Sequence, residues 1–200
     1  LLVATRGGEG LTRLSRDGTV AARREVHAVG PIVIDGGRGR IAAAVPGYAI
    51  VTVPLPGAAA GTIHSLPSDV RSTVFVWSDT GRLLVGDAIG RLVLWDDRTS
   101  RAEVLDTLGT GVDALACTFT GKPRVVVCAG KTVWIYDLAA DGTPRGEARR
   151  VIDLPVQTGT VRQVAWAPDG ASFVIGTNTG EVERFDADTG VALGLFARHA

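Results

Sequence analysis

The sequence predicts an all-β chain in which a unit of four short strands recurs about every 40 residues. Residues 161–200 show the unit most plainly, because four apolar runs are separated there by three turn signals. The turns are Pro168-Asp169-Gly170, Asn178-Thr179-Gly180 and Asp188-Thr189-Gly190. Short runs rich in Val and aromatic residues between Gly-containing turns are typical of antiparallel strands joined by hairpins.

An aromatic residue near the end of the third run marks the repeat. Phe185 follows Tyr136 by 49 residues and Tyr136 follows Trp95 by 41, and Asp comes directly after each of them. Val53 and Leu14 take the same place in two earlier copies. A glycine precedes four of these markers by 14 or 15 residues, at Gly39, Gly81, Gly121 and Gly170. A four-stranded unit cannot bury both apolar faces alone, so this period predicts stacked sheets, the blades of a β-propeller.

Several segments resemble blades of the WD-repeat propeller family. They are VAWAPDG (164–170), LVLWDDRT (92–99), TVWIYDLA (132–139) and RFDADTG (184–190). The resemblance is good over 70–200, and residues 1–69 share only the spacing. The polar network of many such blades is expected to be absent, since the turn between second and third strands offers Ile89, Gly130 and Thr179 in place of Asp, and the Gly-His pair is missing. The blades are therefore degenerate, similar to those of bacterial proteins.

We expect five units in one propeller domain or fragment, at residues 1–30, 31–69, 70–110, 111–160 and 161–200. The first unit offers three strands and lacks the innermost one. Either a later segment supplies that strand and closes the ring, or the chain is a slice of a larger ring. We expect the second case, a fragment of a ring of about six to eight blades, because the resembled family most often has more than five.

The later units follow the same plan. In the second, Pro54 suits a strand end, where no ladder donor is required. The final strand of the third unit, 102–108, carries Glu103 and Asp106 and is expected to face solvent. The fourth unit is longer because residues 139–150 form a Gly/Pro/charged insertion between its third and fourth strands.

Composition limits the function classes. Of the 200 residues, 46% are apolar, which indicates a well-buried core. The 21 basic and 21 acidic side chains cancel, which argues against a nucleic-acid partner. No apolar run is long enough for a membrane span. The excess of Arg over Lys favours a bacterial source. Cys117 and Cys128 are expected on adjacent strands as buried, reduced thiols, which favours a cytoplasmic location.

The sequence offers little catalytic chemistry. His27, His64 and His199 form no ligand spacing with cysteines or carboxylates. Gly130-Lys131-Thr132 imitates the end of a phosphate-binding loop, but the first glycine and the helix are missing, so we interpret it as a hairpin turn. Six aspartates recur after third strands and are interpreted as turn-capping residues: Asp96, Asp97, Asp137, Asp141, Asp186 and Asp188. We therefore expect no catalytic residue, no cofactor and no metal.

The remaining aromatic residues are interpreted as core. Trp77, Cys117 and Trp166 share one position, four residues before the turn glycine, and are expected to pack between blades. Trp134 precedes Tyr136 by two residues, so both side chains should lie on one face of their strand.

The candidate partner-binding residues lie in two kinds of place. Turns between second and third strands, which in the resembled family open on the face that engages partners, carry Tyr48, Asp87, Lys131 and Asn178; Asp113 and Arg162 lie near the start of first strands. We expect a non-catalytic scaffold or sensor module that binds a protein partner or a neighbouring effector domain of its own chain. The alternatives are a propeller enzyme or small-ligand sensor that uses the central channel, and a stacking spacer that binds nothing.

Overall fold

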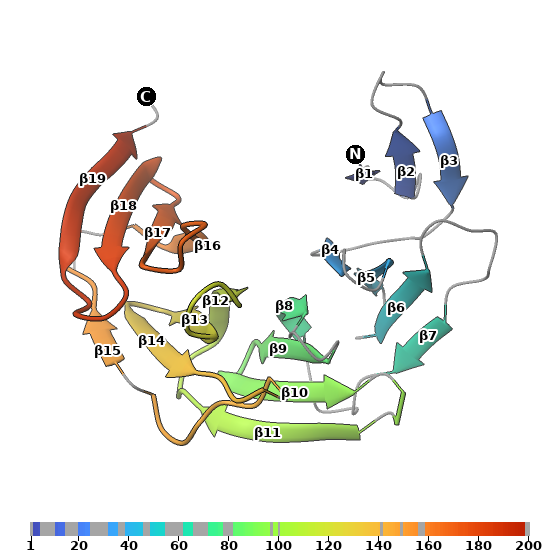
Figure 1. The fold of residues 1–200 in the computed structure, drawn as a ribbon, viewed down its shortest axis with the longest axis horizontal. Helices are drawn as coiled ribbons and strands as arrows, with labels where there is room; N and C mark the ends of the chain where they lie inside the picture. The colour runs from blue at the N-terminus through green and yellow to red at the C-terminus, as the bar shows by residue number, and fades with distance from the viewer. Residues whose placement is uncertain are drawn as a thin grey trace. The chain divides into compact units, whose positions relative to one another are not determined.

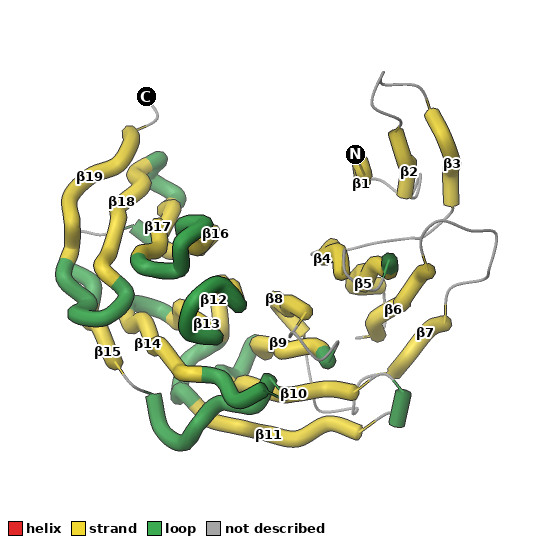
Figure 2. The backbone as a smooth tube through the Cα atoms, in the orientation of Figure 1, coloured by secondary structure: helices red, strands yellow, loops and turns green. Residues whose placement is uncertain are grey.

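A computed structural model of the chain describes residues 2–4, 11–14, 20–24, 32–35, 39–45, 49–54, 62–65, 72–77, 82–96, 98–99, 101–140, 142–148, 150–155 and 159–198. Within these ranges every regular element is a β-strand (Figure 2). None of the described segments forms a helix with the length and apolar character that crossing a membrane requires. The chain divides into two compact units, Leu1–Val70 and Arg71–Ala200.

The first unit contains two antiparallel sheets. One has three strands, β1 (Leu2–Ala4), β2 (Leu11–Leu14) and β3 (Val20–Arg24). The other has four, β4 (Ile32–Asp35), β5 (Arg40–Val45), β6 (Ala49–Pro54) and β7 (Thr62–Ser65). In this second sheet the central strands are buried, with Ile41 opposite Val53 in register. Pro54 is the last residue of β6, as its missing amide hydrogen requires.

The second unit contains three antiparallel four-stranded sheets, each ordered along the chain. They are β8 (Ser72–Trp77), β9 (Leu83–Asp87), β10 (Arg91–Asp96) and β11 (Arg101–Thr107); β12 (Val112–Thr118), β13 (Arg124–Ala129), β14 (Thr132–Asp137) and β15 (Arg150–Asp153); and β16 (Val161–Trp166), β17 (Ser172–Thr177), β18 (Glu181–Asp186) and β19 (Ala192–Arg198). Within this unit the first strands β8, β12 and β16 lie side by side, and β11, β15 and β19 form the outer edge (Figure 1). The predicted all-β fold of four-stranded antiparallel sheets is confirmed; the placement of the five blade boundaries stays a prediction.

The aromatic markers of the repeat occupy equivalent places. Trp95, Tyr136 and Phe185 are each the fifth residue of a six-residue third strand, β10, β14 and β18. All three are buried, with exposed fractions of 0%, 1% and 3%. The residue that follows each of them is the aspartate that ends the strand. The repeat read from the sequence is therefore a repeat of structure.

The predicted turns of the last sheet are confirmed. In the turn from β16 to β17 the amide of Gly170 donates to the carbonyl oxygen of Ala167 at 2.9 Å, and its φ of 69° suits glycine. Gly180 and Gly190 close the next two turns in the same way, with φ values of 80° and 72°. The glycines of the sequence motif therefore set the turn positions and, with them, the strand register.

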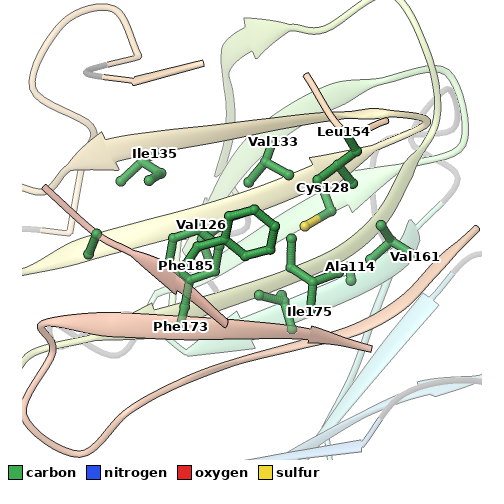
Figure 3. Packing of buried hydrophobic residues seen from close by; sticks show 12 residues of the cluster. Ala114, Val126, Cys128, Val133, Ile135, Leu154, Val161, Phe173, Ile175 and Phe185 are labelled. Carbon is green, nitrogen blue, oxygen red and sulfur yellow. The ribbon is translucent and has the colours of Figure 1, made fainter. Parts of the chain in front are cut away.

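A core of apolar side chains joins the last two sheets (Figure 3). Val126 and Cys128 of β13 meet Phe173 and Ile175 of β17 there, and the rings of Phe173 and Phe185 stack with centroids 5.5 Å apart. Phe173 also receives the edge of the Trp166 ring. Each such side chain contributes about 1.5–3 kcal/mol when fully buried, so the sheets are held mainly by this stacking.

A second core lies on the other face of the β12–β15 sheet. Val125 and Val127, which alternate with the residues of the first core along β13, pack there with Tyr136 and with Leu92 and Leu94 of β10. Because sheets cover both of its faces, all six residues of β13 are buried. This is why residues 125–129 of the strand are a continuous apolar run in the sequence rather than an alternating one.

The inter-sheet roles predicted for two aromatic positions are confirmed. The indole Nε1 of Trp166 donates to the carbonyl oxygen of Ala116 at 2.9 Å, which links β16 to β12. Trp134 packs against the same core as Tyr136, on the same face of β14. Cys117 packs against that core as well. The side chain of Trp77 lies outside the described residues.

Both thiols are free, on adjacent strands β12 and β13. They do not face each other, because Cys117 is opposite Val125 and Cys128 is opposite Ala114. Burial raises the pKa of Cys117, and burial together with the charge of Asp113 raises the pKa of Cys128 to about 12. Both thiols therefore stay neutral at physiological pH.

The aspartates after the third strands have the structural roles predicted for them. Asp186 accepts hydrogen bonds from the backbone and the hydroxyl of Thr189, which lower its pKa. Burial acts to raise the pKa of Asp96, but hydrogen bonds from Arg98 outweigh it and hold the pKa below its ordinary value. Asp97 and Asp141 lie outside the described residues.

A buried arginine ties two of these aspartates together. Arg124, with 3% of its side chain exposed, donates to Asp137 of its own sheet at 3.2 Å and to Asp188 of the next sheet at 2.6 Å. The pair with Asp188 joins residues 64 positions apart. This edge of the second unit is therefore fixed by an ion network as well as by apolar packing.

Candidate functional site

The turns between second and third strands and the loops that enter the first strands meet along one edge of the second unit. We call this surface the loop rim; it comprises residues 88–90, 110–111, 130–131, 159–160 and 178–180, together with the first residues of β12 and β16, which include Asp113 and Arg162. It lies at the end of the sheets where β12 and β16 begin, opposite the edge that carries Arg124. All of its segments belong to the three sheets of the second unit.

Each entering loop lies between two turns. Thr110 contacts the β9–β10 turn on one side, where a Cβ placed on Gly90 would lie 2.4 Å from its carbonyl oxygen. On the other side, a Cβ placed on Gly130 in the β13–β14 turn would lie 3.3 Å from the Thr110 side chain. The backbone thus passes too close at Gly90 for any side chain there. Glycine at this turn lets neighbouring sheets approach along the rim.

The next loop repeats the arrangement with hydrogen bonds. The amide of Thr160 donates to Oδ1 of Asn178 at 2.8 Å, and the amide of Asn178 donates to the carbonyl oxygen of Thr160 at 2.9 Å. On the other side, Nζ of Lys131 donates to the carbonyl oxygen of Gly159 at 3.4 Å. The β15–β16 loop is thereby fixed to both of its neighbouring turns.

Asp113 stabilises the rim from below. Its Oδ2 accepts a hydrogen bond from the amide of Gly130 at 2.8 Å, which ties the start of β12 to the β13–β14 turn. Gly130 and Lys131 form a tight two-residue turn, since Ala129 and Thr132 pair directly. The triplet from Gly130 to Thr132 is therefore a hairpin turn, as predicted, and no phosphate loop.

The prediction that Asp87 faces a partner needs correction. Its side chain is fully buried, with an exposed fraction of 0%. Oδ1 accepts hydrogen bonds from the amides of Ile89 and Arg91, and Oδ2 pairs with Nε of Arg91 at 2.7 Å. A short polar side chain at the start of a turn closes that turn by such bonds, so Asp87 stabilises the turn and is not available at the surface.

The other candidates differ in exposure. Lys131, Arg162 and Asn178 are exposed on the rim, and Asp113 is half-buried. Tyr48 lies outside the described residues. The structure therefore brings four of the six candidate residues to one edge of the second unit.

Sequence reasoning missed two features of the rim. Ile89 has 59% of its surface exposed at the tip of its turn. The entering loops that separate the turns were also overlooked, although a signal was present: a Gly-Thr pair stands just before the first strand at Thr110 and again at Thr160.

The exposed side chains of the rim suit the binding of a partner. They are an ammonium, a guanidinium, an amide, hydroxyls and one aliphatic group, which suit a mixed polar and apolar contact. Among the residues that the structure describes, no cluster of His, Cys, Asp and Glu side chains could hold a metal ion. The nearest thiol, Cys128, is kept neutral by burial and by Asp113.

Comparisons with known proteins identify the fold. No protein-family model matches the chain, and no curated protein sequence matches it. The chain is similar to the crystal structure of the β-propeller domain of Myceliophteria thermophila Cps50 (Swd1), with a TM-score of 0.78 and 19% sequence identity. The match covers 98% of this chain and 68% of that one. The chain therefore has a β-propeller fold, which is the fold that its resemblance to WD-repeat blades predicts.

Proposed function

We propose that this β-propeller chain is a non-catalytic interaction module that binds a protein partner, or a neighbouring domain of its own polypeptide, through the loop rim. A propeller fold hosts many activities; 1294 chains of solved structures match this one. Function has to be argued from the site. The site residues that we assign to binding are Lys131, Arg162 and Asn178, supported by Asp113.

One observation carries the proposal: the exposed side chains of the rim stand on a backbone that is already fixed. The reciprocal bonds between Thr160 and Asn178 and the bond from Gly130 to Asp113 order the loops before any partner arrives. A surface that needs no ordering loses less conformational entropy on binding. Rigid display of polar and charged side chains is what a recognition platform requires.

Charge and compartment follow from the same proposal. Lys131 and Arg162 give the rim two exposed positive charges, so we expect the partner to present carboxylates there. The two neutral free thiols fit a reducing, cytoplasmic setting.

Site-specific photo-crosslinking tests the proposal. The full chain carrying p-benzoylphenylalanine at Ile89, which is 59% exposed on the rim and carries no charge, is irradiated in an extract of its source cells, and crosslinked proteins are identified by mass spectrometry. The matched control carries the same group at Asp169, which is exposed on the opposite edge. We expect one protein to crosslink from the rim position and not from the control position.

A charge-reversal pair completes the test. Lys131→Glu with Arg162→Glu should abolish that crosslink, while Lys122→Glu with Arg145→Glu, two exposed cations on the opposite edge, should leave it intact. Circular dichroism confirms that both double variants fold. Equal crosslinking from the two edges, or insensitivity to the rim charges, would contradict the proposal.

A further inference from the structure

A groove of about 240 Å³ lies on the outer side of the second unit, next to the loop rim, since its lining residues Thr177 and Glu181 flank the rim turn 178–180. Leu154 and Pro155, where the chain leaves β15, form one wall. The face of the β16–β19 sheet forms the other, with Ile175 and Phe185 at its base. The groove exists because β15 spans only Arg150–Asp153, whereas β19 extends over Ala192–Arg198.

Glu183 is one of two glutamates of β18 that line the groove, and it lies in the middle of the sheet wall. Glu183 of β18 is opposite Ile175 of β17 on one side and opposite Leu195 of β19 on the other. These three side chains share one face and all line the groove. Glu183 is half-buried, and among the described residues no cation or hydrogen-bond donor pairs with its carboxylate. A half-buried carboxylate gains more than a fully exposed one from a cationic partner, because water screens the attraction less.

The groove already contains one guanidinium group, which pairs with the neighbouring glutamate of β18. Arg198 donates to Glu181 at 2.6 Å, and both residues line the groove. Glu181 and Glu183 are two positions apart in β18 and point to the same face. Glu183 offers the same carboxylate chemistry, closer to the apolar base.

We propose that this groove binds an Arg or Lys side chain carried by an extended segment of a partner protein. The aliphatic stem of that side chain lies on Ile175 and Leu195, and its charged group pairs with Glu183. The groove thus offers an apolar contact for the stem and a carboxylate for the charge. An extended segment suits the site, because it can follow the direction of the outer strands. The inference rests on the proposed function, because it gives the same interaction module a second contact surface for a basic partner segment.

Titration of the isotope-labelled full chain, followed by amide NMR, tests the inference. The probe is the peptide acetyl-Ala-Leu-Arg-Leu-Ala-amide, and the control probe carries citrulline in place of arginine, which keeps the shape and removes the charge. We expect binding with a dissociation constant on the order of millimolar, with shifts at Ile175, Glu183 and Leu195. The citrulline peptide should bind about tenfold more weakly.

Two variants locate the interaction. Glu183→Gln removes the charge at constant shape and should also weaken the arginine peptide about tenfold. Glu147→Gln, which removes an exposed carboxylate from the β14–β15 loop, should change nothing. Equal affinity for the two peptides, shifts outside the groove, or no effect of Glu183→Gln would overturn the inference. The loop-rim variants change the side chains of Lys131 and Arg162, neither of which lines this groove, so the proposed function and this inference can fail separately.

Discussion

Replacing Arg124 by alanine should destabilise the second unit far more than replacing any exposed arginine. Arg124 is almost fully buried and joins Asp137 to Asp188 of the next sheet. The substitution removes two buried methylenes, at about 0.8 kcal/mol each. It also breaks two charge-assisted hydrogen bonds, which are discounted to about 1 kcal/mol together because the acceptors remain 38% and 57% exposed. The expected loss in free energy of unfolding is about 2–3 kcal/mol.

Urea denaturation at pH 7, followed by tryptophan fluorescence, measures this loss. Arg98→Ala is the matched control, because Arg98 also pairs with an aspartate after a third strand but has 72% of its side chain exposed. Its expected cost is below about 0.5 kcal/mol. Arg124→Met, which keeps an apolar stem of similar length, should recover the packing part of the loss and not the ion pairs.

The reasoning would be refuted if Arg124→Ala and Arg98→Ala shifted the urea midpoint equally. A further check is the double-mutant cycle of Arg124→Ala with Asp188→Ala. The coupling free energy should be about 0.5–1 kcal/mol, and zero coupling would show that the inter-sheet pair contributes nothing.

Three further predictions concern turns and titration. Gly170→Ala should lower the melting temperature more than Gly146→Ala: both glycines have positive φ, but a Cβ at Gly170 would lie 2.6 Å from a backbone carbonyl oxygen and one at Gly146 meets nothing within 4 Å; equal shifts would rule out the steric account. Stability should fall as pH rises above about 8.5, because the thiol of Cys128 ionises there in the unfolded chain but stays neutral up to about 12 in the folded one. The fall in urea midpoint between pH 7.5 and pH 10 should therefore be smaller in Cys128→Ala than in the parent chain. The depressed pKa of Asp186 stabilises the fold above the unfolded value of about 3.9, so melting temperatures at pH 7 and pH 3 should differ less in Asp186→Asn than in the parent chain.

The strands and turns could be predicted from the sequence because their signals are local. Trp95, Tyr136 and Phe185 each occupy the fifth position of a third strand, because the fold buries the side chain at that position in each of the three sheets. Glycines such as Gly170 mark turns because only glycine adopts positive φ without strain. The candidate rim could be predicted for the same reason. The turns between second and third strands occur once in each repeat, so they lie at the same edge of the stacked sheets.

The errors and omissions concern contacts that no local pattern encodes. Asp87 is a candidate in the sequence because turns between second and third strands open on the partner-binding face in the resembled family, yet its carboxylate points inward and bonds the amide and the guanidinium of Arg91 at the start of β10. In the sequence Glu181 and Glu183 look like ordinary solvent-facing residues of a strand, so the groove carboxylate of Glu183, which pairs with no cation among the described residues, could not be predicted. Their place in a groove depends on the length of β15 in the neighbouring sheet.

By itself the sequence determined the repeat, the strand type and the turn positions of this protein, because each depends on a few neighbouring residues. Only the tertiary structure decided which repeats exchange contacts: Trp166 with Ala116, Arg124 with Asp188, Thr160 with Asn178. These pairs form because stacked sheets bring together residues that are far apart along the chain. The sequence pattern shows which residues lie on each face of a sheet. It does not show which side chains of one face meet those of the next, because that depends on how the sheets are stacked.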